Sequence, residues 1–289
     1  MDAAEILKRV RKIEIKTKGL SKHIFSGEYH SAFKGRGMSF SEVRDYQYGD
    51  DVRNIDWNVT ARTGDPHIKV FEEDRELTVM LMVDISKSSL FGTSEKFKSE
   101  LIAELSAVIS FSAITNNDKV GALLFTDKVE KYIPPKKGKS HILRIIREII
   151  YYEAESNGTN IDKALVYLNN ILKKRSIVFI LSDFISEDYS SSLSIARKRH
   201  DIIGMQIYDQ WEQELPNVGL IESMDPETGE TKLLDSSNSS FRKNYKSYFE
   251  EHNKRFIELF RKNKLDTLSI STSDDYVKLL LLFFKRRGR

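Results

Sequence analysis

Five oxygen-bearing side chains occur where a single hard cation would need them. An Asp-x-Ser-x-Ser run follows the apolar residues 77–83, a threonine lies in a Gly-Thr-Asn turn, and a second aspartate follows the apolar run of residues 177–181; the five are Asp84, Ser86, Ser88, Thr159 and Asp183. Two carboxylates and three hydroxyls form an all-oxygen set that suits Mg²⁺ and not zinc or copper. Because the set leaves a coordination position for water or a partner's carboxylate, it indicates binding more than catalysis.

The elements that must position these residues alternate between strands and helices. We expect strands at residues 77–83, 119–125, 129–133, 176–181, 201–208 and 266–270, and helices at residues 95–116, 140–153, 160–173, 189–199, 239–263 and 274–284. Residues 211–235 contain two prolines and two glycines, which predicts a loop or short hairpin. This alternation predicts an α/β fold with a doubly wound, mainly parallel sheet covered by helices on both faces.

Such a sheet binds ligands beyond the carboxyl ends of its strands, where the strand order reverses. Asp84 and Asp183 each follow a buried strand, so they converge if these strands are neighbours. Two carboxylates in a partly dry crevice repel each other, and a divalent cation removes that cost. The alternative is a purely structural role, in which Asp84 stabilises a turn and Thr159 caps a helix.

Composition narrows the class of protein. The chain has 289 residues with 46 basic and 43 acidic side chains, and the two signs are interleaved, so we expect no nucleic-acid partner. It contains no cysteine, which excludes disulfides, thiol catalysis and zinc–thiolate sites. We recognise no signal peptide, and the longest apolar run, residues 279–284, is far shorter than the roughly 20 residues of a membrane span. These features predict a cytoplasmic protein.

The first 76 residues differ in character from the rest. Ile6, Val10 and Ile13 predict a helix over residues 3–18, whose basic face we interpret as solvated; a membrane or partner face is the alternative. Residues 26–75 have few aliphatic side chains but many aromatic and charged ones, which argues against disorder. We expect residues 1–76 to pack on a main domain that spans residues 77–289.

The main domain resembles a von Willebrand factor A domain. The resemblance covers residues 77–285, and the five oxygen-bearing residues match the family's metal-ion-dependent adhesion site. It implies that the first and fourth strands lie side by side, so that Asp84 and Asp183 meet. It also implies a bound Mg²⁺, or another divalent cation such as Mn²⁺ or Ca²⁺, and a protein partner that offers an acidic residue.

The preceding segment is similar to the signature of the bacterial domain-of-unknown-function 58 family. The matching residues are Gly35, Gly37, Phe40, Arg44, Tyr46, Gly49, Asp50, Arg53, Ile55, Asp56, Trp57 and Arg62. Ser39 and Ser89 depart from the family pattern, but neither is a metal ligand. The resemblance implies a partner or adaptor of a MoxR-type AAA+ ATPase.

The signature segment has two interpretations. Its arginines can pair bidentately with Asp50, Asp51 or Asp56, which would clamp a segment without a core onto the main domain. We favour this clamp, with Trp57 as a buried anchor. The alternative is a partner-binding face built from the same residues.

Other chemistry fits the chain poorly. Gly138-Lys139-Ser140 lacks the upstream glycine of a phosphate-binding loop, because Ile133 occupies that position. The six histidines have no metal-ligand spacing. The C-terminal apolar run and the basic residues after it permit at most peripheral membrane contact, and packing on the sheet explains them as well.

We therefore expect a non-enzymatic, Mg²⁺-dependent protein-binding module. The three hydroxyls would coordinate the ion directly, and the two aspartates would act mainly by charge and through waters. The alternative is a metal-dependent hydrolase that uses the same ion to activate water. A third reading is a structural scaffold with a vestigial site.

Overall fold

The computed structural model describes residues 39–72, 76–93, 97–224 and 230–288. The contacts divide the chain into two compact units, with a boundary between Glu76 and Leu77. The predicted helix over residues 3–18, as well as Gly35 and Gly37 of the signature, lies outside the described residues. The predicted packing of residues 1–76 on the domain of residues 77–289 therefore stays a prediction.

The larger unit contains a six-stranded sheet. Its strands are β3 (Thr78–Asp84), β4 (Lys119–Phe125), β5 (Val129–Lys136), β6 (Ile177–Ser182), β7 (Asp201–Tyr208) and β10 (Asp266–Ser271), in the order β10-β7-β6-β3-β4-β5. Every neighbouring pair is parallel except β4 and β5, which are antiparallel. The predicted α/β class with a mainly parallel sheet is confirmed.

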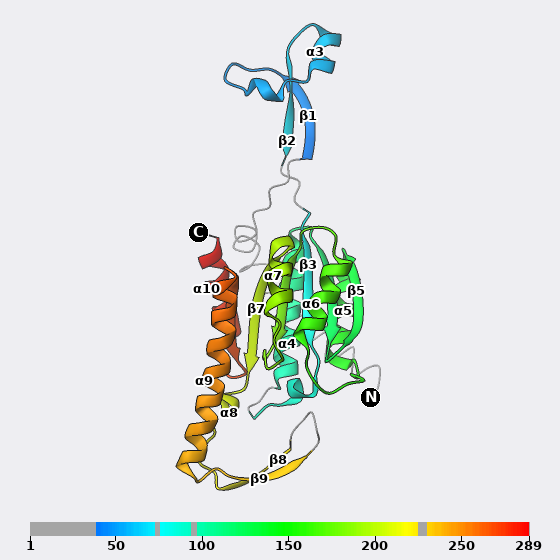
Figure 1. Ribbon diagram of the computed structural model, residues 1–289. Coiled ribbons are helices and arrows are strands. Elements are labelled where there is room, and N and C mark those ends of the chain that lie inside the picture. The colour runs from blue at the N-terminus through cyan, green and yellow to red at the C-terminus, as the bar shows by residue number, and fades with distance from the viewer. Residues whose placement is uncertain (1–38, 73–75, 94–96, 225–229, 289) are drawn as a thin grey trace. The chain divides into compact units, whose positions relative to one another are not determined.

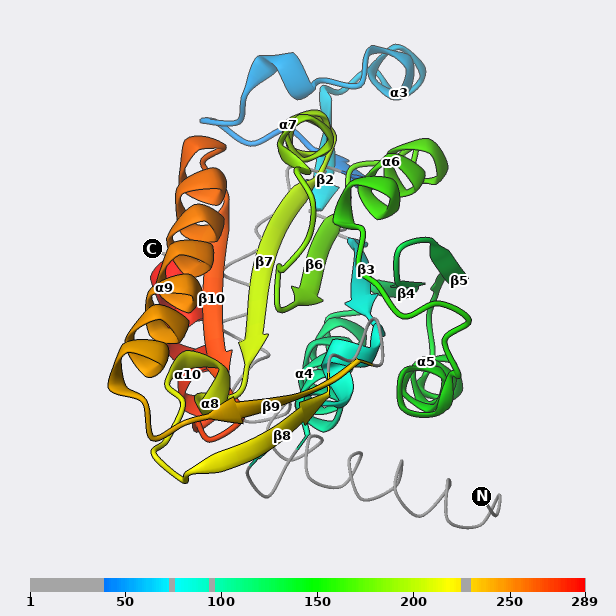
Figure 2. The ribbon, with the colours of Figure 1, turned by 60° about the horizontal axis from the view of Figure 1, so that its bottom comes forward.

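Helices cover both faces of this sheet (Figures 1 and 2). They are α4 (Lys98–Thr115), α5 (Lys139–Tyr151), α6 (Ile161–Ile171), α7 (Ser190–Arg199), α9 (Ser239–Lys262) and α10 (Tyr276–Arg287). Side chains of β3 such as Met80 and Met82 pack in one cluster with α6, α7 and α9, while α4, α5 and α10 lie on the opposite face. Because both faces are covered, the central strands are apolar along almost their whole length.

The predicted elements differ from the observed ones mainly at their ends. Strands β4 and β7 have the predicted bounds. Strand β5 extends three residues beyond the prediction through Pro134 and Pro135, which an edge strand tolerates because one side of it has no partner strand. The predicted hairpin is the pair β8 (Leu220–Met224) and β9 (Thr231–Asp235). A short helix that we did not predict, α8 (Gln210–Gln213), follows β7.

The smaller unit is built on one antiparallel pair, β1 (Ser39–Asp45) and β2 (His67–Glu72). Between these strands lie a 3-10 helix (Val52–Asn54) and the helix α3 (Trp57–Thr63). Ile68 is buried, and it pairs with Ile55 in an isolated bridge. Among the residues of this unit whose burial is described, Ile68 is the buried apolar side chain, and polar contacts stabilise the turns between the two strands.

No helix in the described part of the chain is both long and apolar enough to cross a membrane.

Helix α9 lies directly against the backbone of β7. A Cβ added at Gly204 would come within 2.6 Å of Phe260 and 2.9 Å of Phe256. These two rings also support the turn that follows β6, as described below. The close approach of helix and strand therefore requires glycine at this position.

We predict that Gly204→Ala lowers the free energy of unfolding by about 1–3 kcal/mol, because the added methyl group overpacks the aromatic rings of α9. Urea unfolding would measure the change. Ser191→Ala, at an exposed position of α7, is the control and should leave stability nearly unchanged. Equal stability of the two variants would contradict the close contact.

Candidate metal centre

The structure brings the five predicted residues to one edge of the sheet. Strands β3 and β6 are parallel neighbours, and Val83 pairs with Leu181. Asp84 follows Val83 at the end of β3. Ser182 follows Leu181 at the end of β6, and Asp183 is the next residue after Ser182. The predicted adjacency of the first and fourth strands of this unit is therefore confirmed, and it places both aspartates at the same edge.

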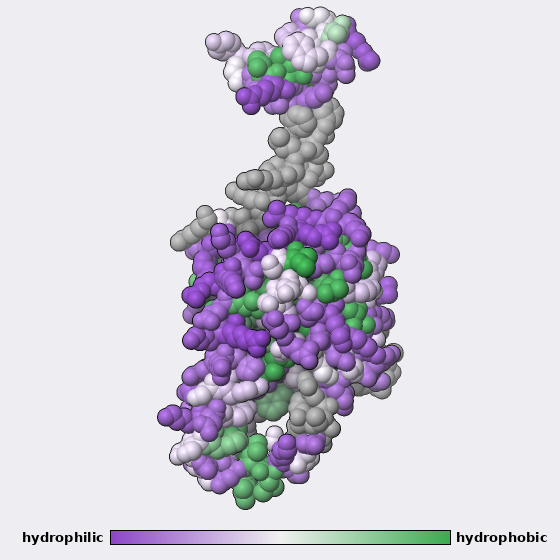
Figure 3. All heavy atoms as spheres, in the orientation of Figure 1, coloured by the Kyte–Doolittle hydropathy of each residue, from purple (hydrophilic) through white to green (hydrophobic). Residues whose placement is uncertain are grey.

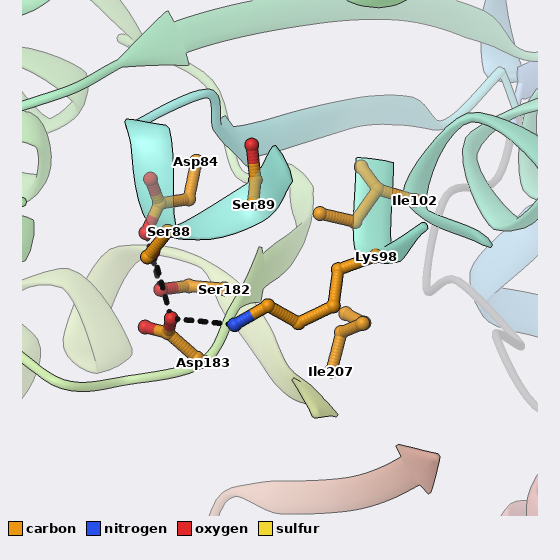
Figure 4. Close-up of a pocket in the computed structure, with 8 residues that line it drawn as sticks. All are labelled: Asp84, Ser88, Ser89, Lys98, Ile102, Ser182, Asp183 and Ile207. Carbon is orange, nitrogen blue, oxygen red and sulfur yellow. Dashed lines mark hydrogen bonds and ion pairs between the residues drawn. The ribbon is translucent and has the colours of Figure 1, made fainter. Parts of the chain in front are cut away.

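Hydrogen bonds connect side chains of this cluster, and Figure 4 shows three of its members, Asp84, Ser88 and Asp183. The hydroxyls of Ser86 and Ser88 lie 3.0 Å apart, and Ser88 Oγ donates to Asp183 Oδ2 at 2.8 Å. Thr159 Oγ1 donates to Asp84 Oδ2 at 3.4 Å. These bonds form two neighbouring groups, one of Ser86, Ser88 and Asp183 and one of Thr159 and Asp84, and they join residues up to 95 positions apart in the sequence. We call these five residues the metal centre, as a candidate site for a divalent cation.

Asp84 is held by two neighbours at the ends of the strands. Ser182 Oγ donates to Asp84 Oδ2 at 2.7 Å, and the backbone N–H of Ser86 donates to Asp84 Oδ1 at 3.0 Å. Ser89 Oγ donates to the carbonyl of Ser86 at 2.7 Å, which fixes the 3-10 turn Lys87–Leu90. The spacing of the Asp-x-Ser-x-Ser run therefore follows from a tight turn directly after β3.

The loop that carries Thr159 is hydrogen-bonded to the three loops that follow β3, β4 and β6. The N–H of Lys87 donates to the carbonyl of Asn157 at 3.3 Å, and the N–H of Asn160 donates to the carbonyl of Thr126 at 2.9 Å. Ser186 Oγ donates to the carbonyl of Thr159 at 3.3 Å. These backbone contacts bring the threonine hydroxyl to the centre from the side.

A strained residue fixes the turn that carries Asp183. Phe184 has a φ of 60°, a left-handed conformation that costs a bulky residue about 1–3 kcal/mol. Its buried ring packs against Phe256 at a centroid distance of 4.2 Å and against Phe260 at 5.5 Å. This packing offsets the strain and holds the neighbouring Asp183 at the edge of the sheet.

The electrostatics of the centre favour a cation. Asp84 is 2% exposed, and its burial, together with the nearby charge of Asp183, raises its pKa to about 6. Among the described residues, no group of three or more histidine or carboxylate side chains is arranged to hold a metal ion alone. The donor set is therefore two carboxylates supplemented by hydroxyls, which fits a hard divalent cation such as Mg²⁺.

Three further residues at the centre were not predicted from the sequence. Ser182 binds Asp84 as described, and the ammonium group of Lys98 lies 3.1 Å from Asp183 Oδ2 (Figure 4) and 2.6 Å from Glu212 Oε1. Ser182 could have been found as the last residue of a strand next to Asp183. Lys98 and Glu212 carry no such signal, because they lie on α4 and α8 and only the tertiary structure brings them here.

The signature residues serve mostly local roles within the smaller unit. Arg44 forms the predicted bidentate pair with Asp50, at 2.8 and 2.9 Å, and this hydrogen bonding lowers the pKa of Asp50. Asp56 accepts from the N–H groups of Asn58 and Val59 and so caps α3. Gly49 has a φ of 106°, which glycine adopts readily.

Other signature residues lie at the surface of this unit. Trp57 is 69% exposed, because it is the first residue of a two-turn helix with no buried residue, whereas Ile68 and Asp56 occupy the buried positions. Its predicted role as a buried anchor on the main domain stays a prediction. Arg53 and Arg62 are exposed and form no ion pair with another described residue, and Tyr46 is half-buried. Whether the segment clamps the main domain stays a prediction.

One family model and several proteins of known sequence are similar to this chain. The family model described as "Protein of unknown function DUF58" matches residues 42–255. An uncharacterized protein of Mycobacterium tuberculosis is 28% identical over all of this chain and 92% of its own length. The uncharacterized protein YeaD of Bacillus subtilis is 28% identical over 38% of this chain and 25% of its own length.

Similar solved structures share little sequence with this chain. The conserved hypothetical protein BatB of Bacteroides thetaiotaomicron is 15% identical, with a TM-score of 0.49 over 73% of this chain and 98% of that one. The SpRpn10 VWA domain is 11% identical, with a TM-score of 0.39 over 74% of this chain and 94% of that one.

We predict that the metal-free protein becomes less stable as the pH rises from about 4 to 6, because of Asp84. Folding raises the pKa of this carboxyl from 3.8 to about 6, so the folded state keeps a proton that the unfolded state loses. The difference corresponds to about 3 kcal/mol. Asp84→Asn lacks this term, so its stability relative to the wild type in EDTA should increase across this range.

Chemical unfolding of both proteins at pH 4.5, 5.5 and 6.5 would measure this difference. Saturating Mg²⁺ should remove the wild-type loss, because the cation stabilises the ionised carboxylates. A stability difference between the two proteins that does not change with pH would contradict the electrostatic assignment.

Proposed function

Because the chain belongs to the DUF58 family, whose model covers most of it, and because five oxygen donors meet at one edge of its sheet, we propose that it is a non-enzymatic, Mg²⁺-dependent protein-binding module. The hydroxyls of Ser86, Ser88 and Thr159 would hold the ion, while Asp84 and Asp183 would supply its countercharge. Bound there, the ion would offer a Lewis-acidic position to a carboxylate of the partner. The convergence of these five side chains is the observation that carries the proposal.

The loops around the centre support a protein partner. Phe91 and Phe97, in the loop before α4, are 41% and 51% exposed, and Ile185, two residues after Asp183, is 43% exposed. Exposed apolar side chains next to a polar centre are typical of interaction sites. A partner segment with an acidic residue between apolar ones would match this surface.

The hairpin β8–β9 adds apolar surface on the same side. Figures 1 and 2 place it at the edge where the parallel strands end, and Figure 3 shows apolar side chains gathered at that end of the unit. Leu220 and Leu233 are 68% and 69% exposed. The hairpin therefore supports a macromolecular partner more than a small substrate.

The chemistry of the centre gives less support to a hydrolase. Besides the two aspartates, Glu212 is the carboxylate found at the centre among the described residues, and it is committed to Lys98. A general base needs an accessible lone pair near the attacked water. A turnover assay with phosphoesters and Mg²⁺ would promote the hydrolase if sustained activity were lost in Asp183→Ala.

The partner in this proposal is a MoxR-type AAA+ ATPase or one of its client proteins, in the cytoplasm. This part of the proposal rests on the resemblance of the signature segment to the domain-of-unknown-function 58 family. The chain would then act as an adaptor in the assembly or remodelling of protein complexes.

We predict that Asp84→Ala and Ser88→Ala abolish Mg²⁺-dependent co-purification with the MoxR-type ATPase encoded in the same genome. Each variant removes a donor or a countercharge, and we expect at least about a tenfold loss of retained partner, in line with the loss of a buried charge-assisted contact. Circular dichroism would verify the fold. Asp188→Ala, an exposed aspartate in the loop after Asp183, is the matched control and should bind normally. Binding that persists unchanged in EDTA would rule out the metal-dependent mechanism.

A further inference from the structure

A buried lysine lies beside the metal centre. Lys98 is the first residue of α4, and it is 1% exposed. Its ammonium group lies 3.1 Å from Asp183 Oδ2, the same oxygen that accepts the hydrogen bond of Ser88. A cation of this chain is therefore already placed within the group of side chains that would bind Mg²⁺. The five proposed ligands alone do not account for this lysine.

The position of the ammonium group is fixed from its other side. Glu212 Oε1 accepts from Lys98 at 2.6 Å, and Glu212 Oε2 accepts from the N–H of Asp209 at 2.8 Å. Asp209 is fully buried and accepts hydrogen bonds from Thr93 and Thr272. Glu212 thus ties Lys98 to a rigid network beyond the metal centre. Lys98 cannot follow Asp183 freely when that carboxylate turns towards a metal ion.

The charges of the centre balance for one divalent cation. Asp84 and Asp183 contribute two negative charges, and the ion pair of Lys98 with Glu212 is neutral overall. Because Lys98 touches Asp183 directly, it stabilises this carboxylate when no metal is bound. The same ammonium group repels a divalent cation that approaches Asp183, since unlike an exposed charge it is hardly screened by solvent.

We propose that Lys98 is a resident cation that lowers the affinity of the centre for divalent metal ions, and that Glu212 limits this effect by neutralising part of the ammonium charge through its ion pair with Lys98. This role presupposes the Mg²⁺ centre proposed above and adds its regulation. Lys98 would also keep the loaded centre from becoming negative, so that a partner's carboxylate is not repelled. Metal binding and partner binding would then favour each other.

The test compares the Mg²⁺ affinities of four proteins by isothermal titration calorimetry: the wild type, Lys98→Met, Glu212→Gln and the double variant. We expect Lys98→Met to bind Mg²⁺ about tenfold more tightly or better, because a buried positive charge is removed. Glu212→Gln should bind at least about threefold more weakly, because Lys98 then pairs with Asp183 alone. In the Lys98→Met background, Glu212→Gln should still weaken Mg²⁺ binding, because it removes a carboxylate charge near the ion, but the double variant should bind Mg²⁺ more tightly than Glu212→Gln alone, because the unpaired ammonium group is absent.

Two controls separate this role from a purely structural one. Lys87→Met removes an exposed lysine between Ser86 and Ser88, and screening by solvent should keep its Mg²⁺ affinity within about twofold of the wild type. Thermal unfolding in EDTA should show that Lys98→Met is less stable than the wild type and that Mg²⁺ restores more stability to it. If Lys98→Met does not fold, the double variant, which leaves no unpaired buried carboxylate at position 212, tests the proposal by its tighter Mg²⁺ binding than that of Glu212→Gln alone.

The outcomes distinguish this proposal from the proposed function. Equal Mg²⁺ affinities in all four proteins would overturn the role of Lys98 and leave the metal centre intact. Binding of Mg²⁺ by none of them would overturn both. The expected affinities combined with Mg²⁺-independent co-purification would support the role of Lys98 and refute the proposed function.

Discussion

The repulsion between two carboxylates at the edge of one sheet is the constraint on which the rest of this structure depends. The parallel pairing of β3 with β6 brings Asp84 and Asp183 together, and burial prevents water from screening them. Hydrogen-bond donors and one buried ammonium group lie next to the two carboxylates. Ser182 and the N–H of Ser86 stabilise Asp84, while Ser88 and Lys98 stabilise Asp183. The elevated pKa of Asp84, about 6, indicates that these contacts alone do not offset the burial, and a divalent cation would complete the balance.

The hydrophobic core contributes to this arrangement as directly as the polar groups do. Helix α9 approaches β7 closely because position 204 is a glycine, and its rings Phe256 and Phe260 hold Phe184 in a left-handed conformation. The orientation of Asp183 therefore depends on aromatic packing on one face of the sheet. On the other face of the sheet, α4 begins with Lys98. The helices on that face therefore supply the positive charge that lies beside Asp183. A change in either layer is expected to alter the affinity of the centre for metal ions.

The smaller unit is stabilised mainly by polar contacts within its turns. Among its residues whose burial is described, Ile68 is the buried apolar one, and its turns are stabilised by the pair of Arg44 with Asp50 and by the capping carboxylate of Asp56. Exposed Trp57 lies next to this cap and contributes no burial within the unit. Signature residues of one segment thus divide into those that build local structure and those that remain on its surface.

Much of the fold and of the candidate site could be predicted from the sequence. Continuous apolar runs, each followed by an aspartate, predicted the buried strands β3 and β6, because a strand covered on both faces must be apolar along its length. Chain order and the Asp-x-Ser-x-Ser spacing predicted five residues that the structure brings together. The predicted role of Trp57 as an anchor on the main domain stays a prediction, because a lone aromatic residue in a short irregular segment has no periodic pattern that identifies the surface it packs against. Only the tertiary structure brought Lys98 and Glu212 to the centre, since no local spacing relates the first residue of one helix to a carboxylate 114 positions away. The sequence by itself therefore determined which oxygen donors lie at the edge of the sheet, and the packing of α4 and α8 decided which charges surround them.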